Sequence, residues 1–139
     1  WDFFTALPTT VVVDHMGRPD VSKPVDGPEF ALFEKFMREN SNVWSKVSCP
    51  ERLSVTGPKA LNGEQSAYRD VIPFARRIVE SFPDRVLWGT DWPHPNLKDH
   101  MPDDGLLVDF IPHIAVTAEL QRKLLVDNPM RLYWPEERA

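Results

Sequence analysis

This sequence of 139 residues lacks several signals that would place a protein in a specialised class. It has one cysteine, Cys49, so no disulfide can form within the chain. No apolar run approaches the roughly 20 residues that a membrane-spanning helix needs. A net charge of −5 gives no basic footprint of the kind that binds nucleic acids or anionic membranes. We therefore expect neither a nucleic acid nor a membrane as a partner.

Sequence motifs of common cofactor sites are missing as well. There is no His-x-His pair, no paired-cysteine motif, no His-Glu-x-x-His motif and no glycine-rich phosphate loop. A catalytic zinc ion usually takes about three protein ligands, and such a set is hard to find here. We expect no metal and no other cofactor. The lone cysteine and the lack of a signal-peptide pattern favour a cytoplasmic location.

The sequence alternates between short apolar runs and amphipathic segments. Continuous β-branched and apolar runs predict buried strands at 9–14, 42–49 and 85–89. Apolar residues at helical spacing predict helices at 29–39, 67–82, 106–114 and 117–126, and a long polar loop is expected at 51–63. Pro73 either kinks the second of these helices or marks its first turn, and the third is expected to break near Pro112. Thr117 is expected to cap the N-terminus of the fourth. This alternation is typical of parallel βαβ units, so we predict an α/β fold.

Three strands are too few to close a (β/α)₈ barrel, which needs eight strands and about 250 residues. The chain also begins with apolar and aromatic residues (Trp1, Phe3 and Phe4), whereas chain ends usually lie at the surface. We therefore expect residues 1–139 to be the C-terminal part of a larger protein.

Each predicted strand is followed by side chains that can do chemistry. In chain order these are Asp14 and His15, then Glu51 and Arg52, then Asp91 and His94. The carboxyl ends of parallel strands meet at one face, which is where barrel enzymes build their active sites. This convergence is more specific than any single residue.

The third of these loops is the most informative. Pro93 and Pro95 prevent a regular continuation of the strand, so Asp91 is presented by a stiff loop. Asp91 suits a general base or a metal ligand, and a polar cap of the turn is the plainer interpretation. His15 suits a metal ligand, a carbonyl-polarising group or a proton shuttle, or it is simply bonded to nearby backbone. Arg52 suits a substrate carboxylate, or it is a solvated charge.

The remaining candidates carry less weight at this stage. Cys49 falls in a predicted strand and is interpreted as part of the core rather than as a nucleophile. We assign no role to His100 or His113.

Four segments together resemble one enzyme family. They are Asp-His-Met-Gly-Arg-Pro at 14–19, Cys-Pro-Glu-Arg-Leu-Ser at 49–54, Gly-Thr-Asp-Trp-Pro-His-Pro-Asn at 89–96 and Asp-Asn-Pro-Met-Arg-Leu-Tyr at 127–133. They are similar to the C-terminal part of the 2-pyrone-4,6-dicarboxylate hydrolases, which are lactonases of the amidohydrolase superfamily in bacterial lignin and aromatic catabolism. The resemblance covers nearly the whole chain, and its specific part is the run from Gly89 to Pro95.

The resemblance implies a distorted (β/α)₈ barrel in which residues 1–139 form a partial domain with about strands six to eight. The missing N-terminal strands would belong to the same protein. It implies hydrolysis of a small dicarboxylate lactone, 2-pyrone-4,6-dicarboxylate, to 4-carboxy-2-hydroxymuconate without a metal. Asp91 would activate water, His15 would polarise the lactone carbonyl, and Arg52 would hold a substrate carboxylate. We assign His94 to substrate binding as well.

Two alternatives stay open. One is a zinc-dependent lactonase or decarboxylase of the same superfamily. The other is a truncated half-barrel without activity. The family's His-x-His motif and further substrate-binding arginines belong to its N-terminal part, so we expect the 139-residue chain alone to be inactive or nearly so.

Overall fold

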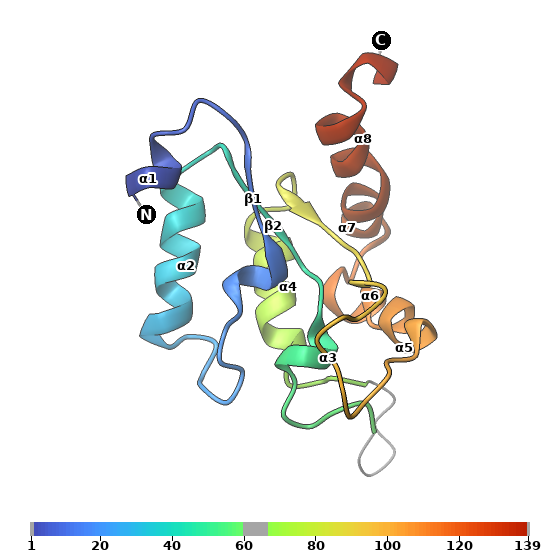
Figure 1. Cartoon of the computed structure of the whole chain (residues 1–139). Coiled ribbons are helices and arrows are strands. Elements are labelled where there is room, and N and C mark those ends of the chain that lie inside the picture. Colours follow the sequence, from blue (N-terminus) through green and yellow to red (C-terminus); the bar gives the residue numbers. More distant parts are fainter. Residues whose placement is uncertain (1, 60–66, 139) are drawn as a thin grey trace.

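Figure 1 shows the computed structural model of the chain, which describes residues 2–59 and 67–138. Residues 60–63 of the predicted polar loop lie outside the described residues. The described part is an α/β fold with a small parallel sheet, as predicted. Within these ranges, every helix is too short or too polar to cross a membrane.

The sheet has three parallel strands in the order β1-β2-β3, namely β1 (Val11–Val13), β2 (Val43–Lys46) and β3 (Val86–Leu87). Val12 lies opposite Trp44, and Ser45 lies opposite Val86. The strands are shorter than the predicted runs because left-handed residues, among them His15 and Cys49, turn the chain out of the sheet. The parallel register brings the carboxyl ends of all three strands to one edge.

Two long helices connect the strands. Helix α2 (Pro28–Glu39) joins β1 to β2, and α4 (Ile72–Ser81) precedes β3. Helix α4 begins five residues later than predicted, because Pro73 occupies its first turn rather than its interior. The rings of Phe30 and Phe74 meet edge to face, with 4.9 Å between their centroids. The core between these helices and the sheet also contains Met37, Val43, Val71, Ile78, Val79 and Val86.

The remaining elements are short. Before and between the strands lie α1 (Asp2–Thr5), the 3₁₀ turn η1 (Asp14–Gly17) and α3 (Pro50–Leu53). After β3 come α5 (Asp104–Asp109), α6 (Ile111–Ile114), α7 (Ala118–Arg122), the π-helical turn η2 (Lys123–Asp127), α8 (Asn128–Tyr133) and the 3₁₀ turn η3 (Pro135–Arg138). Figure 1 shows α5 to α8 following one another along one side of the molecule.

Three of these elements differ from the sequence prediction. Helix α3 lies inside the predicted loop 51–63, where Pro50 suits the first turn of a helix. The predicted helix 106–114 is broken as expected into two helices, but they meet at Phe110 rather than near Pro112. The predicted helix 117–126 ends its α-helical part at Arg122 and continues as a π-helical turn. Its predicted cap is confirmed, because the Thr117 hydroxyl accepts a hydrogen bond from the Leu120 amide.

Asn128 joins helix α8 to the sheet. Its side chain is fully buried, and its amide donates to the carbonyl oxygens of Pro83 and Val86, each at 2.8 Å. Removing this amide would leave two buried carbonyls without their donor, and an unsatisfied buried group costs about 1–3 kcal/mol.

We therefore expect Asn128→Ala to lower the free energy of unfolding by about 2 kcal/mol or more. Asn96→Ala, the same change at an exposed loop position, should have little effect. Urea unfolding of both variants measures the difference. Equal stability of the two variants would show that Asn128 does not hold α8 on the sheet.

Asp70, which precedes α4, binds the residues that directly follow α3. Its carboxylate accepts hydrogen bonds from the hydroxyls of Ser54 and Thr56 and from the amides of Val55 and Thr56. Burial acts to raise the pKa of Asp70, but these hydrogen bonds outweigh it and hold the pKa below its ordinary value of 3.8.

A carboxyl group with a lowered pKa in the folded state stabilises the fold above its unfolded pKa, and that stabilisation fades as the pH falls through its folded pKa. We expect Asp70→Asn to be less stable than the parent at pH 7. The difference between the two should shrink as the pH is lowered below about 4. Urea unfolding of the parent and of Asp70→Asn at pH 7 and below about pH 4 tests this. A difference in unfolding free energy that stays constant with pH would contradict it.

Candidate active site

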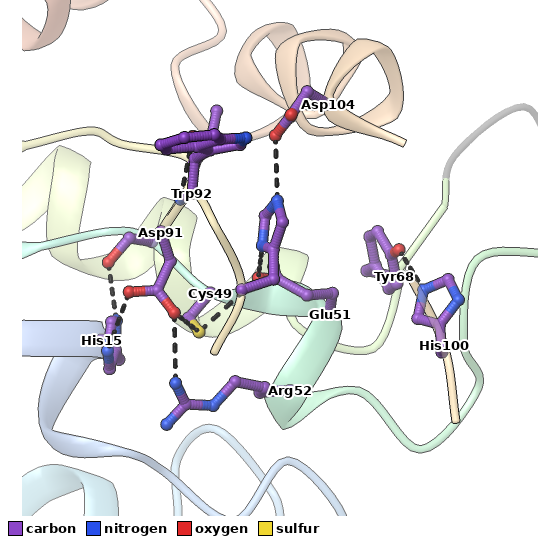
Figure 2. Close-up of polar contacts among 12 residues, drawn as sticks. His15, Cys49, Glu51, Arg52, Tyr68, Asp91, Trp92, His100 and Asp104 are labelled. Carbon is purple, nitrogen blue, oxygen red and sulfur yellow. Dashed lines mark hydrogen bonds and ion pairs between the residues drawn. The ribbon is translucent and has the colours of Figure 1, made fainter. Parts of the chain in front are cut away.

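Three of the predicted site residues meet at the carboxyl edge of the sheet (Figure 2). His15 lies in η1 after β1, Arg52 lies in α3 after β2, and Asp91 follows β3. Arg52 Nη1 is 3.1 Å from Asp91 Oδ2, which makes a hydrogen-bonded ion pair. His15 Nε2 is 3.8 Å from Asp91 Oδ1, which is beyond hydrogen-bond distance. The structure therefore places these three residues together around the Asp91 carboxylate.

The backbone at this edge is unusual. Six non-glycine residues after the three strands have positive φ angles, namely His15, Met16, Arg18, Cys49, Asp91 and His94. Such conformations cost of order 1–3 kcal/mol each and cluster at active sites and ligand clamps. These strained residues lie in three different loops, and their conformations direct side chains of all three loops toward one point.

The His15 ring is held by the segment that follows β2. Its Nδ1 lies 2.8 Å from the hydroxyl oxygen of Ser48, which is itself buried. Gly17, which ends η1, has φ +69, and a Cβ there would come within 3.1 Å of the Phe33 ring. Glycine is therefore needed for the turn that carries His15. With Nδ1 engaged by Ser48, Nε2 is the ring atom directed toward Asp91.

Arg52 gives the Asp91 carboxylate a cation from the chain itself. The two side chains are 13% and 23% exposed, so their attraction is only partly screened by water. A guanidinium has five N–H donors, and one of them serves Asp91. The others can bind an anionic group of a ligand at the mouth of the site.

Cys49 is buried, as predicted, but it is more than a core residue. It lies after β2 as the left-handed N-cap of α3, and its Sγ is 3.2 Å from Asp91 Oδ2. Burial, then the charges of Glu51 and Asp91, raise the pKa of this thiol far above its ordinary value. The thiol therefore stays protonated and donates to Asp91. Sequence reasoning missed this contact because it depends on the left-handed turn at Cys49.

His94 is buried between two carboxylates. It is 3% exposed, and its Nδ1 is 3.1 Å from Glu51 Oε1 while its Nε2 is 3.2 Å from Asp104 Oδ1. Each ring nitrogen of His94 is therefore within hydrogen-bond distance of a carboxylate oxygen. His94 thus joins α3 to α5 beneath the site, and its assignment to substrate binding stays a prediction.

A second histidine completes a buried polar contact nearby. His100 Nε2 lies 2.9 Å from the hydroxyl of Tyr68, a fully buried side chain (Figure 2). Burial raises the pKa of Tyr68 to about 12. Without His100 the phenol would lose this hydrogen-bond partner, so His100, which received no role from the sequence, has a structural one.

The same edge offers a set of potential metal ligands. Ligand atoms of His15, Cys49 and Asp91 all lie within 4.8 Å of one another. Imidazole, thiolate and carboxylate are all zinc ligands, and three protein ligands with an open position are the usual catalytic arrangement. The donor set therefore fits zinc in type and spacing. Zinc would first have to displace the Cys49 proton and compete with Arg52 for Asp91.

Comparison with known proteins identifies the family of this chain. A family model described as Amidohydrolase matches residues 2–134. The chain belongs to the amidohydrolase family. It is 90% identical over 137 residues to a 2-pyrone-4,6-dicarboxylate hydrolase of Comamonas testosteroni, covering 99% of this chain and 45% of that protein. It is 40% identical to a 4-sulfomuconolactone hydrolase of Hydrogenophaga intermedia, covering 91% of this chain and 39% of that protein.

A solved structure agrees with the fold. The crystal structure of a protein from Agrobacterium tumefaciens superimposes with a TM-score of 0.71 at 29% sequence identity, over 93% of this chain and 43% of that one. The present chain thus spans less than half the length of these relatives.

The buried contact between Glu51 and His94 generates a stability prediction. Removing one partner of a buried hydrogen bond leaves the other group unsatisfied and costs about 1–3 kcal/mol. We expect Glu51→Gln to lower the free energy of unfolding by about 2 kcal/mol. Glu80→Gln, the same change on the exposed face of α4, is the matched control. If urea unfolding shows the two variants to be equally stable, the contact between Glu51 and His94 does not stabilise the fold.

Proposed function

We propose that this chain carries the catalytic half of a lactone hydrolase, with 2-pyrone-4,6-dicarboxylate as substrate and 4-carboxy-2-hydroxymuconate as product. The observation that carries the proposal is the Asp91 carboxylate held by Arg52 beside His15 at the ends of three parallel strands. The 90% identity to a hydrolase of that substrate supports the choice of lactone. This reaction belongs to bacterial aromatic catabolism, and the cytoplasmic location predicted from the sequence stays a prediction.

The reaction requires a base, an electrophilic contact and a means to hold the substrate. Asp91 Oδ1 takes a proton from water as the water oxygen bonds to the lactone carbonyl carbon. His15 Nε2 donates to the carbonyl oxygen as negative charge develops there. When the tetrahedral intermediate collapses, the bond from the carbonyl carbon to the ring oxygen breaks. The ring oxygen then receives the proton that Asp91 holds.

Arg52 would hold the substrate while it stabilises the base. Its remaining N–H groups can take a carboxylate of the lactone in a paired hydrogen bond. The dicarboxylate needs a second cationic contact, which we place in the half of the protein that is not part of this chain. This requirement agrees with a chain that spans 45% of the related hydrolase.

We also propose that the three strands are about strands six to eight of a distorted (β/α)₈ barrel. Strand β1 is at the edge of the sheet, and its three valines are half-buried, whereas Val43, Val86 and Leu87 are buried. A groove beside β1 is lined by Phe4, Val11, Val13, Leu32, Phe33 and Phe36. An apolar edge strand of this kind is normally covered or paired. A preceding barrel strand would cover it.

A zinc-dependent lactonase or decarboxylase is the second candidate. The close approach of His15, Cys49 and Asp91 supports it, and these three residues would hold the ion. Bound zinc would supply Lewis-acid activation of water or of a carbonyl. We favour the metal-free reaction because Arg52 already gives Asp91 a positive partner.

The assignment of Asp91 can be tested in a chimera of the Comamonas testosteroni hydrolase in which this chain replaces the matching segment. Asp91→Asn keeps the shape of the side chain and removes its basicity, so we expect kcat for the pyrone to fall at least about a hundredfold. Loss of the pyrone absorbance measures the rate. Asp99→Asn, the same change at an exposed position in the same loop, should leave kcat unchanged.

Two results would contradict the proposal. A parent chimera that folds but does not open the pyrone would show that the pyrone is not the substrate. An Asp91→Asn variant with the parent's kcat would remove Asp91 as the base. We expect the 139-residue chain by itself to show little or no turnover, and activity equal to that of the chimera would overturn the half-barrel proposal.

A further inference from the structure

The Cys49 thiol has no part in the reaction proposed above, yet it contacts the proposed base. Its Sγ lies 3.2 Å from Asp91 Oδ2, and Arg52 Nη1 lies 3.1 Å from the same oxygen. The other oxygen, Oδ1, is 3.8 Å from His15 Nε2 and makes no hydrogen bond with it. The two carboxylate oxygens are therefore held differently.

We propose that Cys49 is a positioning residue: together with Arg52 its thiol fixes Oδ2 of Asp91, so that Oδ1 is the oxygen that accepts the proton from water. This inference rests on the proposed hydrolysis for its catalytic meaning. The hydrogen bond itself does not, because it is a property of the folded site.

The sulfur acts here as a donor. Cys49 is 1% exposed, and its Sγ lies within hydrogen-bond distance of the Asp91 carboxylate. A thiol has one proton to donate. Asp91 Oδ2 at 3.2 Å is closer than Glu51 Oε1 at 3.6 Å, so the proton goes to Asp91.

The direction of the thiol is set by the backbone turn at Cys49 and by the buried contact between Glu51 and His94. Cys49 has φ +64, and its carbonyl accepts from the Arg52 amide at 3.2 Å, which closes the turn into α3. Glu51 lies two residues further along the same turn and is joined to His94 in the interior. Both contacts hold the start of α3, and with it the Cys49 side chain, against the loop of Asp91.

Kinetics of the chimera test the positioning role. Cys49→Ala removes the donor, and we expect kcat to fall about tenfold while KM changes less than twofold, because loss of one hydrogen bond to a charged group is of that size. Cys49→Ser keeps an O–H donor and should recover most of the lost kcat. A Cys49→Ala variant with the parent's kcat, or a Cys49→Ser variant as slow as Cys49→Ala, would overturn the proposal.

Spectroscopy tests the hydrogen bond without any turnover. The chain has one cysteine, so its Raman spectrum has a single S–H stretching band. That band should shift in Asp91→Asn, because Asp91 is the acceptor, and stay in place in Asp99→Asn, the same change at an exposed position of the same loop. A band that stays in place in Asp91→Asn would overturn the proposal. The test uses the folded 139-residue chain, so it stands even if the parent chimera does not open the pyrone.

The same variants separate a thiol donor from a zinc ligand. A donor role predicts that the parent chimera, after treatment with a chelator, keeps its activity and that Cys49→Ser stays active. One zinc ion per chain in the parent, lost together with activity in Cys49→Ser, would overturn the positioning role. Thermal unfolding of each variant shows whether it is folded at the assay temperature. If Cys49→Ala is unfolded, Cys49→Ser provides the test of zinc content and activity.

Discussion

The parallel pairing of β2 with both of its neighbours is the constraint on which the site depends. Because β1, β2 and β3 run in the same direction, the loops that leave them emerge at one edge. His15, Arg52 and Asp91 are separated by 37 and 39 residues in sequence, yet the side chains of His15 and Arg52 lie next to the Asp91 carboxylate. No local feature of any one loop would produce this arrangement.

The second constraint is charge. A carboxylate at the mouth of a site must remain ionised to act as a base, and the chain surrounds Asp91 with the guanidinium of Arg52 and a thiol donor. Beneath it, the buried Glu51 contacts one ring nitrogen of His94, and Asp104 contacts the other. The helices α3 and α5 are thus joined through side chains, and the loop that carries Asp91 passes between them.

The sequence predicts part of this structure for identifiable reasons. The strand positions follow from β-branched runs, and Asp91, His15 and Arg52 stand out because each follows a predicted strand. The start of α4 was misplaced because Pro73 fits either a kink or a first turn. The contact between Cys49 and Asp91 and the pairing of His94 with Glu51 could not be predicted. Both depend on left-handed backbone angles at non-glycine residues and on side chains that are far apart in sequence.

The central claim is that Asp91 activates water without a metal ion. The most direct test is to treat the chimera with a chelator, measure its zinc content, and then follow the loss of pyrone absorbance. The account predicts turnover that survives the treatment in protein that contains no zinc. No turnover until zinc is returned would contradict it, and would make His15, Cys49 and Asp91 a metal site instead.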